Sequence, residues 1–391
     1  MKAIILAAWE GSRLRPLTNT IPKPMIKIFW KPIIEHNLEH IYKYVKEIII
    51  VVKYKAEIIE NYFGNNFKWV PVTYHLQNDE KWTWAAIKWI KSDFDVIILN
   101  WDSIFNKNDL KEILEYKWYW ALVKQVPNPE IYGIFKVDNE NNVREIIEKP
   151  ETFVWNLANL WVYKFNSSIL NIVENIPLSK RWEYEITDAI NEFANRYPLK
   201  AIEIKKEFID VGYPWDIIKA NSFFLDKLKE SEIKWKIEDW VVIKWKIILE
   251  SGAIIKSGTY IEWNAYIWKN SEIWPNAHLR WNVVIWDNSC IGHTEVKEVS
   301  IWDNTKAKHF WYIWSSVIWN NVNIAAWFIS MDRRHDNSNI KVMVKWKLID
   351  STLRKLWCVI WDNVRTWVNT LVYPWRMIEN DAFTMPWEII K

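Results

Sequence analysis

The chain opens with a short apolar segment that runs directly into a loop suited to phosphate chemistry. Residues 1–8 are almost entirely apolar, which is typical of a buried parallel strand, and the loop 9–18 follows at once. In an α/β sheet, the loop after the first strand is where backbone N–H groups approach phosphates, and that approach requires residues without a Cβ atom. Gly11 meets this requirement. Trp9 does not, because an indole there would fill the space of the ligand.

A carboxylate follows a second apolar strand, predicted at 95–100. The residues that come next are Trp101, Asp102 and Ser103. An aspartate at the C-terminal end of such a strand can serve a metal or a phosphate, although aspartate is also common in helix caps and turns. A tryptophan again precedes the polar residue at a position that favours a small side chain.

Tryptophan occupies glycine-like positions throughout the chain. There are 32 Trp and only 7 Gly, together 39 residues, which is an ordinary total for glycine when an average protein has about 7%. We therefore interpret most of these tryptophans as glycines of the natural protein, encoded by a UGA codon that the source reads as glycine. Trp215 fits its context as a genuine aromatic. The alternative, a carbohydrate-binding surface rich in Trp, is less favoured because these residues follow turn positions and do not gather on one face.

The C-terminal part carries an aliphatic residue at every sixth position, which predicts a parallel β-helix. The series is Ile237, Ile243, Leu249, Ile255, Ile261, Ile267, Ile273, Leu279, Ile285 and Ile291. A polar interruption at 331–350 is followed by Ile360, Thr366, Val372 and Ile378 in the same period. Three residues after each aliphatic we predict a left-handed corner, occupied by Trp240, Gly252, Gly258, Asn264, Asn270, Asn276, Asn282 and Asn288. The position directly after the aliphatic mixes Gly292 with Trp268, Trp274, Trp286, Trp302, Trp314, Trp319 and Trp361, and no single packing arrangement suits both.

The first part of the chain alternates strands and helices. Strands are predicted at 2–8, 47–52, 70–76 and 95–100, and helices at 32–45 and 56–63. This alternation favours an α/β fold with a Rossmann-like, mostly parallel sheet. We predict a first domain at 1–230, which ends in a connecting helix at 216–230, and a left-handed parallel β-helix of hexapeptide repeats at 231–391.

Residues 9–25 resemble the signature of sugar-1-phosphate nucleotidylyltransferases. The matching string runs from Trp9 through Gly11, Arg13, Arg15 and Thr18 to Pro22-Lys23-Pro24-Met25. The resemblance implies that Arg13 and Lys23 form a catalytic cationic clamp on a nucleoside triphosphate, UTP or dTTP, while a sugar-1-phosphate attacks its α-phosphorus. It implies that Asp102 and Asp210 hold Mg²⁺.

The same resemblance extends to the binding pockets. It assigns nucleotide binding to Ala7, Ala8, Trp9, Gly11, Gln77, Trp82 and Thr83, where Trp82-Thr83-Trp84 stands in place of a Gly-Thr-Gly turn. It assigns sugar binding to Gly133, Glu148 and Asn159. Singly these matches are weak, but they occur in the family's order over some two hundred residues.

The β-helix resembles the acetyltransferase half of the bifunctional members of this family. Lys308-His309-Phe310-Trp311-Tyr312 matches the His-x-x-Tyr element, in which His309 is the general base for the attacking amine. The resemblance implies that Arg280, Lys297 and Tyr312 bind the sugar phosphate and that Asn323 and Ala326 line the acetyl-CoA site.

The chain departs from this pattern at one position. Asp332 stands where the family has an asparagine, and an ionised carboxylate only accepts hydrogen bonds. Acetyl transfer is therefore less securely indicated than nucleotidyl transfer. The adjoining segment 333–336, Arg-Arg-His-Asp, is equally consistent with binding of CoA phosphates and with a solvated loop.

Composition excludes several other classes of function. The net charge is only +3 and the charges are mixed throughout, which does not favour nucleic-acid binding. No apolar run approaches the length of a membrane span, so we expect a soluble, cytoplasmic protein, with Cys290 and Cys358 as unpaired thiols. The resemblance implies a homotrimer or higher homo-oligomer. Two alternatives stay open, namely a β-helix that serves only assembly and a non-catalytic regulatory subunit.

Overall fold

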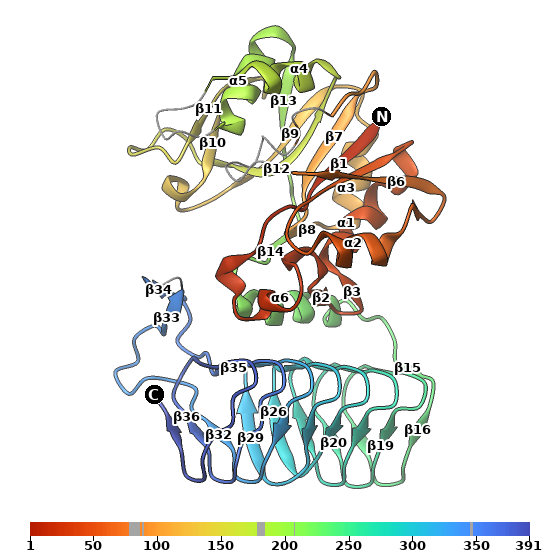
Figure 1. Cartoon of the computed structure of the whole chain (residues 1–391), viewed down its shortest axis with the longest axis vertical. Coiled ribbons are helices and arrows are strands. Elements are labelled where there is room, and N and C mark those ends of the chain that lie inside the picture. Colours follow the sequence, from red (N-terminus) through yellow and green to blue (C-terminus); the bar gives the residue numbers. More distant parts are fainter. Residues whose placement is uncertain (78–86, 88–89, 178–183, 207, 345–346) are drawn as a thin grey trace. The chain divides into compact units, whose positions relative to one another are not determined.

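The apolar segment that opens the chain forms β1 (Lys2–Leu6), which lies inside a Rossmann-like sheet (Figure 1). The structure is a computed structural model that describes residues 1–391 except 78–86, 88–89, 178–183, 207 and 345–346. β1 pairs in parallel with β4 (Ile48–Val52) and β7 (Val96–Asn100), and β4 pairs in parallel with β6 (Val70–Leu76). These four strands confirm the predicted ones to within two residues at each end.

The sheet also contains antiparallel strands, which make it mixed. β12 (Leu157–Phe165) runs antiparallel to β7, to β9 (Tyr119–Gln125) and to β10 (Gly133–Val137). β10 pairs with β11 (Val143–Glu148), and β13 (Leu199–Glu203) runs parallel to β9. The strand order is β11-β10-β12-β7-β1-β4-β6-β5, with β5 at Asn66–Phe67. The expectation of parallel pairing thus holds for β7, β1, β4 and β6.

Amphipathic helices bury their apolar stripes against this sheet. α1 (Ile33–Ile41) buries Ile34, Leu38 and Ile41 on one face. It ends four residues before the predicted end because a 3-10 turn, Tyr42–Tyr44, follows. The other helices of this part are α2 (Ala56–Phe63), α3 (Lys107–Leu114), α4 (Ser168–Asn175) and α5 (Ile186–Arg196). α4 and α5 share one buried core with β1, β7 and β12.

The chain divides into two compact units. The first contains Met1–Gly11, Ile21–Lys27 and Lys31–Asp210, and the second contains Ser12–Thr20, Ile28–Trp30 and Val211–Lys391. Near the end of the first unit, β14 (Ile209–Asp210) pairs antiparallel with β8 (Ser103–Ile104). The second unit starts with α6 (Pro214–Leu225), the predicted connecting helix, which is capped by a reciprocal pair of bonds between Tyr213 and Asp216.

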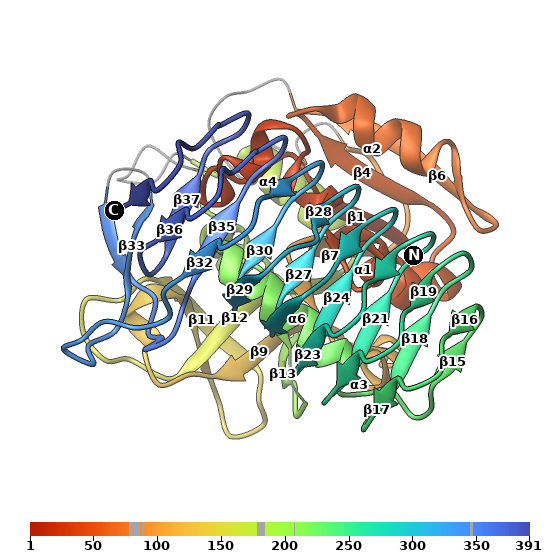
Figure 2. The same cartoon turned by 90° about the horizontal axis from the view of Figure 1, so that it is seen from below.

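The second unit is the left-handed parallel β-helix that the hexads predicted. Figure 2 shows its strands stacked side by side. One sheet contains β15 (Glu232–Ile233), β18 (Ile247–Leu249), β21 (Ala265–Ile267), β24 (Val283–Ile285), β27 (Ser300–Ile301), β30 (Val317–Ile318), β35 (Cys358–Ile360) and β37 (Arg376–Ile378). The second contains β16 (Lys236–Ile237), β19 (Ile254–Ile255), β22 (Glu272–Ile273), β25 (Cys290–Ile291), β28 (Lys306–Ala307) and β31 (Asn323–Ile324). The third contains β17 (Val242–Ile243), β20 (Tyr260–Ile261), β23 (His278–Arg280), β26 (Thr294–Lys297), β29 (Trp311–Trp314), β32 (Ile329–Ser330), β36 (Leu371–Val372) and β38 (Ile389–Ile390).

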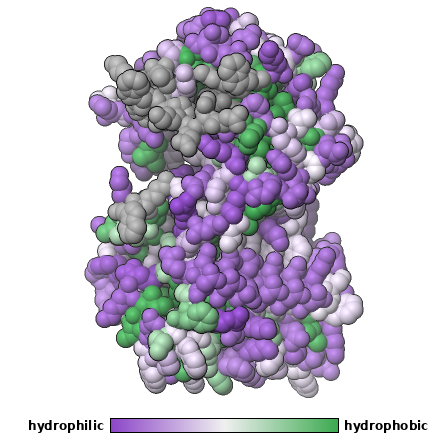
Figure 3. Space-filling model, viewed as in Figure 1, coloured by the Kyte–Doolittle hydropathy of each residue, from purple (hydrophilic) through white to green (hydrophobic). Residues whose placement is uncertain are grey.

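The hexad aliphatics form the interior of the β-helix. From Leu249 to Ile291 each of them is fully buried, whereas Ile237 and Ile243 are only partly buried because they belong to the first coil. The polar interruption at 331–350 leaves the coil and forms a hairpin of β33 (Lys341–Val344) and β34 (Lys347–Asp350). On the face shown in Figure 3 the surface is largely hydrophilic, and the exposed apolar side chains of the last coils include Phe383, Met385 and Ile389.

The predicted left-handed corners are correct at two of the three edges of the β-helix. Trp240, Gly252, Gly258, Asn270, Asn276 and Asn288 all have positive φ. Asn264 and Asn282 do not, so the prediction is wrong there. Their side chains instead bond to each other and to Asp226 at the end of α6, and these hydrogen bonds, not a left-handed backbone, explain the asparagines.

The structure supports the interpretation of many tryptophans as glycines. Tryptophan has positive φ at Trp161, Trp240, Trp281, Trp327, Trp375 and Trp387, a conformation that favours glycine. Within the described residues, buried indole N–H groups have no hydrogen-bond acceptor at Trp101, Trp120, Trp268, Trp302, Trp314, Trp319, Trp357, Trp361 and Trp375, and each such group costs free energy. The rings of Trp302 and Trp319 are tilted by 35° with their centroids 3.5 Å apart, closer than aromatic pairs normally approach.

Candidate functional site

Gly11 and Lys23 meet at close range after β1. Gly11 has φ +70°, and a Cβ atom on it would lie 2.5 Å from the Lys23 Cβ. Lys23 is buried, and its Nζ lies 3.3 Å from the Asp102 carboxylate and 4.6 Å from the centre of the Trp101 ring. The structure thus brings Gly11, Lys23 and Asp102 together. The requirement for a residue without a Cβ atom is met at Gly11.

Asp210 joins this group through strand pairing. In the β14–β8 ladder Asp210 is opposite Ser103, the residue next to Asp102. Asp210 is exposed, and Asp102 is partly buried. Burial, and then the negative charge of Asp210, raise the pKa of the Tyr132 phenol, which places Asp210 near the predicted sugar strand. The two aspartates are 108 residues apart in the sequence, but Asp210 lies on β14 and Asp102 directly precedes β8, its pairing partner.

The other predicted nucleotide residues lie at the same edge of the sheet. Ala7 and Ala8 are buried after β1, and the Ala7 N–H donates to Val51. Gln77 is buried where β6 ends. Trp9 is 46% exposed, so its indole lies over the loop and not in the core. Trp82 and Thr83 lie outside the described residues.

Arg13 belongs to the second unit, in the segment Ser12–Thr20. Its guanidinium lies 5.2 Å from the centre of the Tyr213 ring, a cation–π contact. The sequence did not lead us to predict a role for Tyr213, which stands directly before Pro214, the first residue of α6.

The three predicted sugar-binding residues come together on three neighbouring strands. Gly133 on β10 is opposite Glu148 on β11, and a Cβ atom on Gly133 would lie 2.9 Å from a Glu148 carboxylate oxygen and 3.7 Å from the Asn159 Cβ on β12. The Asn159 Oδ1 accepts hydrogen bonds from the Trp161 N–H and the Tyr163 hydroxyl. Its Nδ2 is buried without an acceptor in the described part of the chain. This amide can therefore donate a hydrogen bond to a bound hydroxyl group.

Arg280, Lys297 and Tyr312 lie on three successive strands of one β-helix sheet. Arg280 on β23 is beside Lys297 on β26, and Tyr312 is on β29. Burial, followed by the charges of Lys355 and Arg280, lowers the pKa of Lys297. Burial, followed by the charges of Glu295 and Asp332, raises the pKa of Tyr312. Tyr312 also lines a cavity of ≈ 570 Å³.

Two glutamates that sequence reasoning missed hold Arg280. Its Nε donates to Glu262 at 2.9 Å and its Nη1 donates to Glu295 at 2.6 Å. A signal was available, because residues 18 apart occupy equivalent positions on consecutive coils, as the Tyr260–His278 register shows, and Glu262 precedes Arg280 by that interval. Arg280 is thus fixed in position by two carboxylates before any phosphate binds.

His309 lies at a corner of the β-helix, three residues before Tyr312. It is exposed, and its ring meets that of Trp274 edge-on at 6.0 Å. The registers Ala307↔Ile324 and Tyr312↔Ile329 make His309 and Ala326 equivalent residues of successive coils. Asn323 lies on β31, three residues before Ala326. The structure therefore associates His309 with the predicted acetyl-CoA residues. Within the described residues it shows no hydrogen bond from His309 to Tyr312.

Comparisons with known proteins agree with this division. The sequence model of the nucleotidyl transferase family matches residues 2–227. The chain is 44% identical over 377 residues to the "Bifunctional protein GlmU" of Methanocaldococcus jannaschii, covering 96% of this chain and 91% of that protein. It is 40% identical over 394 residues to the "Bifunctional sugar-1-phosphate nucleotidylyltransferase/acetyltransferase" of Sulfurisphaera tokodaii, covering 100% of this chain and 97% of that protein. The solved structure of UDP-glucose pyrophosphorylase complexed with UDP-glucose is similar in fold, with a TM-score of 0.53, 23% identity and coverage of 58% of this chain and 99% of that one.

Proposed function

The chain belongs to the nucleotidyl transferase family and, over nearly its whole length, to the bifunctional sugar-1-phosphate nucleotidylyltransferase/acetyltransferases, and on this premise we propose that it carries out two group transfers. The first joins the nucleotidyl group of UTP or dTTP to a sugar-1-phosphate and releases pyrophosphate. The second moves the acetyl group of acetyl-CoA to the amino group of an amino-sugar-1-phosphate.

The group formed by Gly11, Lys23 and Asp102 is the observation that carries the first activity. A nucleoside triphosphate brings several negative charges close together, and the reaction adds more in the transition state. Lys23 supplies a buried positive charge, and Gly11, which has no Cβ atom, lets the Lys23 side chain pack against the loop after β1. The sugar-1-phosphate oxygen attacks the α-phosphorus, and pyrophosphate leaves from the opposite side.

Asp102 and Asp210 fit a magnesium ion. Mg²⁺ binds one or two carboxylates, keeps several waters and takes its other ligands from substrate phosphates. The β8–β14 pairing places Asp210 opposite Ser103, the residue that follows Asp102. When bound, the ion would stabilise negative charge on the phosphate oxygens.

Pyrophosphate release tests the first activity. The protein is incubated with Mg²⁺, UTP or dTTP and a sugar-1-phosphate. We expect Asp102→Asn to lower the rate by about 10- to 100-fold, because it removes a carboxylate that would hold the magnesium ion. Asp93→Asn, a change at an exposed aspartate of the same unit, is the matched control and should leave the rate unchanged. Equal rates in both variants would refute the metal assignment.

The Arg280–Lys297–Tyr312 group supports the second activity. Arg280 and Lys297 can bind the phosphate of an amino-sugar-1-phosphate, and His309 can accept a proton from the attacking amine. The general base lies at a corner beside Ala326. We further propose that the chain forms a homotrimer. Sedimentation of the intact chain tests the trimer.

Consumption of acetyl-CoA with glucosamine-1-phosphate tests acetyl transfer. His309→Gln should lower the rate by about 10²-fold or more if the imidazole is the general base, and it should leave pyrophosphate release unchanged. If the unaltered chain releases pyrophosphate but consumes no acetyl-CoA, the β-helix serves assembly alone. A chain with neither activity would be a regulatory subunit.

A further inference from the structure

Arg13 belongs to a different unit from the other residues of the predicted phosphate loop. Gly11 and Lys23 lie in the first unit, whereas Ser12–Thr20, the segment that carries Arg13, lies in the second unit with the β-helix. The position of this predicted catalytic cation is therefore set by contacts within the β-helix unit.

The segment Ser12–Thr20 is packed along much of its length. Leu14, Leu17 and Thr18 are almost completely buried, each at most 1% exposed. Arg13, which directly precedes Leu14, is exposed. The segment is therefore docked by its buried residues, while Arg13 stays accessible to a ligand.

The end of the segment is fixed by a hydrogen bond to a buried carboxylate of the β-helix. The Thr20 Oγ1 donates to the Asp362 Oδ2 at 3.0 Å, across 342 residues of sequence. Asp362 follows β35 and is only 8% exposed. Its Oδ1 accepts from the backbone N–H and the side-chain amide of Asn320 at 3.1 and 3.0 Å. Asn320 thus holds the carboxylate in one orientation, with the second oxygen directed to Thr20.

Arg13 also contacts the helix that leads into the β-helix. Its guanidinium lies over the Tyr213 ring, 5.2 Å from the centre, and Tyr213 stacks on the buried Trp215 of α6 at 4.5 Å. A buried hydrogen bond of 3.1 Å from the Asn221 Nδ2 to the Ser300 Oγ ties α6 to the β-helix. A cation–π contact leaves the N–H groups of a guanidinium available, so Arg13 can be oriented by Tyr213 and still bind phosphate oxygens.

We propose that the β-helix positions Arg13 for nucleotidyl transfer, and that Asp362 and Thr20 are the positioning residues. The inference rests on the first activity proposed above and gives the β-helix a part in it. When the hydrogen bond between Thr20 and Asp362 is lost, Ser12–Thr20 spends less time in its docked conformation. The fraction of molecules in which Arg13 is placed to bind the triphosphate falls, and kcat/KM falls with it.

Variants of the intact chain that remove or restore this hydrogen bond test the proposal. Thr20→Val keeps the shape of the side chain without its hydroxyl, and Asp362→Ala removes the acceptor. Asp362→Asn restores the link, because its carbonyl can accept from Asn320 while its amide donates to the Thr20 hydroxyl oxygen. We expect kcat/KM for the nucleoside triphosphate to fall about tenfold in the first two variants, the effect of one hydrogen bond to a charged group, and to change by less than about twofold in Asp362→Asn.

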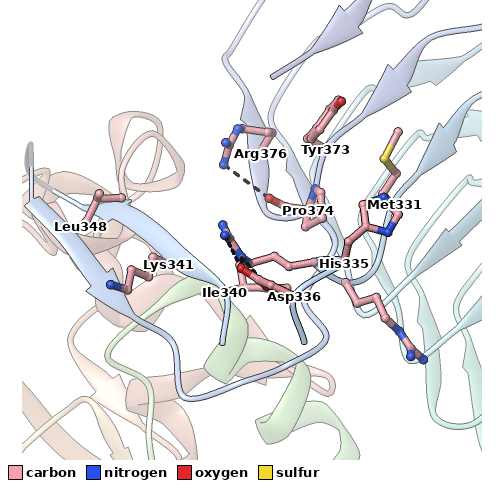
Figure 4. A pocket seen from close by; sticks show the side chains of 11 residues that line it. Met331, His335, Asp336, Ile340, Lys341, Leu348, Tyr373, Pro374 and Arg376 are labelled. Carbon is pink, nitrogen blue, oxygen red and sulfur yellow. Dashed lines mark hydrogen bonds and ion pairs between the residues drawn. The ribbon is translucent and has the colours of Figure 1, made fainter. Parts of the chain in front are cut away.

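Asp350→Ala is the matched control. Asp350 is an exposed aspartate of the same unit and accepts a hydrogen bond from the Thr352 N–H at 2.7 Å. It lies on the hairpin of β33 and β34, opposite Lys341, whose side chain Figure 4 shows. Its removal changes the charge of the unit as Asp362→Ala does, and kcat/KM should stay at the wild-type level. Thr20 is exposed, so Thr20→Val should fold even if Asp362→Ala does not.

A double-mutant cycle with Arg13→Ala separates positioning from a general effect on stability. If Thr20 acts through Arg13, Thr20→Val should lower the residual kcat/KM of Arg13→Ala by less than about twofold, because the group that it positions is gone. A merely structural role would make the two losses additive. Additive losses would therefore overturn the proposal.

Trypsin cleavage after Arg13 gives a readout that does not require activity. The next residue, Leu14, is fully buried, so the protease cuts molecules in which the segment has opened. We expect the product that begins at Leu14 to appear about tenfold faster in Thr20→Val and Asp362→Ala than in Asp350→Ala or the unaltered chain. Equal cleavage rates in all of these proteins would overturn the proposal. An unaltered chain that releases no pyrophosphate would instead refute the proposed first activity, so the two failures are distinguishable.

Discussion

Gly11→Ala should lower the rate of nucleotidyl transfer by more than its loss of stability explains. The new Cβ atom would lie 2.5 Å from the Lys23 Cβ, and ordinary carbon–carbon contact begins near 3.5 Å, so the two segments must separate by about 1 Å. The positive φ of Gly11 adds about 1 to 2 kcal/mol of backbone strain. A displacement of about 1 Å at a catalytic group can lower the rate about 10²-fold.

Gly64→Ala provides the matched control. Gly64 also has a positive φ of 58° with ψ −141°, a region in which an alanine costs about 1 to 3 kcal/mol. However, no atom lies within 4 Å of the Cβ atom that would be added there. The control variant therefore carries comparable backbone strain without moving a catalytic residue.

Pyrophosphate release at saturating substrates and the thermal midpoint are measured for both variants. We expect both midpoints to fall, but only Gly11→Ala to lose about 10²-fold in rate, while acetyl transfer in the same preparation stays at the wild-type level. If Gly11→Ala retains the wild-type rate, or if the two variants lose activity in parallel, the contact between Gly11 and Lys23 does not position the catalytic lysine.

Four further outcomes are expected. Asn159→Ala should raise the KM for the sugar-1-phosphate about tenfold, which is the effect of one lost hydrogen bond in a buried site. Tyr163→Phe keeps the amide donor of Asn159 and should leave this KM unchanged. A change confined to the KM of the nucleotide would contradict the assignment. Trp9→Gly should raise kcat/KM for the nucleoside triphosphate, since it removes an indole from the phosphate loop; an unchanged value would argue against the glycine interpretation. Trp302→Gly should raise the thermal midpoint because it removes the close contact between the Trp302 and Trp319 rings. Truncation of a well-packed buried tryptophan would instead lower the free energy of unfolding by about 3 to 5 kcal/mol. Burial raises the pKa of the Asp362 carboxyl, so ionisation of this group opposes folding, and stability is lost as pH rises through the raised pKa. Asp362→Asn should therefore raise the thermal midpoint more at pH 7 than at pH 4. Equal increases at the two pH values would contradict this.

The local periodicities were sufficient to predict much of the fold. Apolar runs predicted β1, β4, β6 and β7, and the hexads predicted the β-helix, because a strand or coil that buries one face must repeat its apolar residues at a fixed interval. The antiparallel strands β9 to β12 were not predicted, since the direction of pairing depends on partners far apart in the sequence.

The sequence by itself determined which residues could do the chemistry, and the tertiary structure decided which of them meet. The spacing along the chain cannot bring Asp210 close to Asp102, or Gly133 close to Asn159, because these contacts arise from strand pairing. The same holds for the Arg280 group, whose two carboxylate partners come from neighbouring coils.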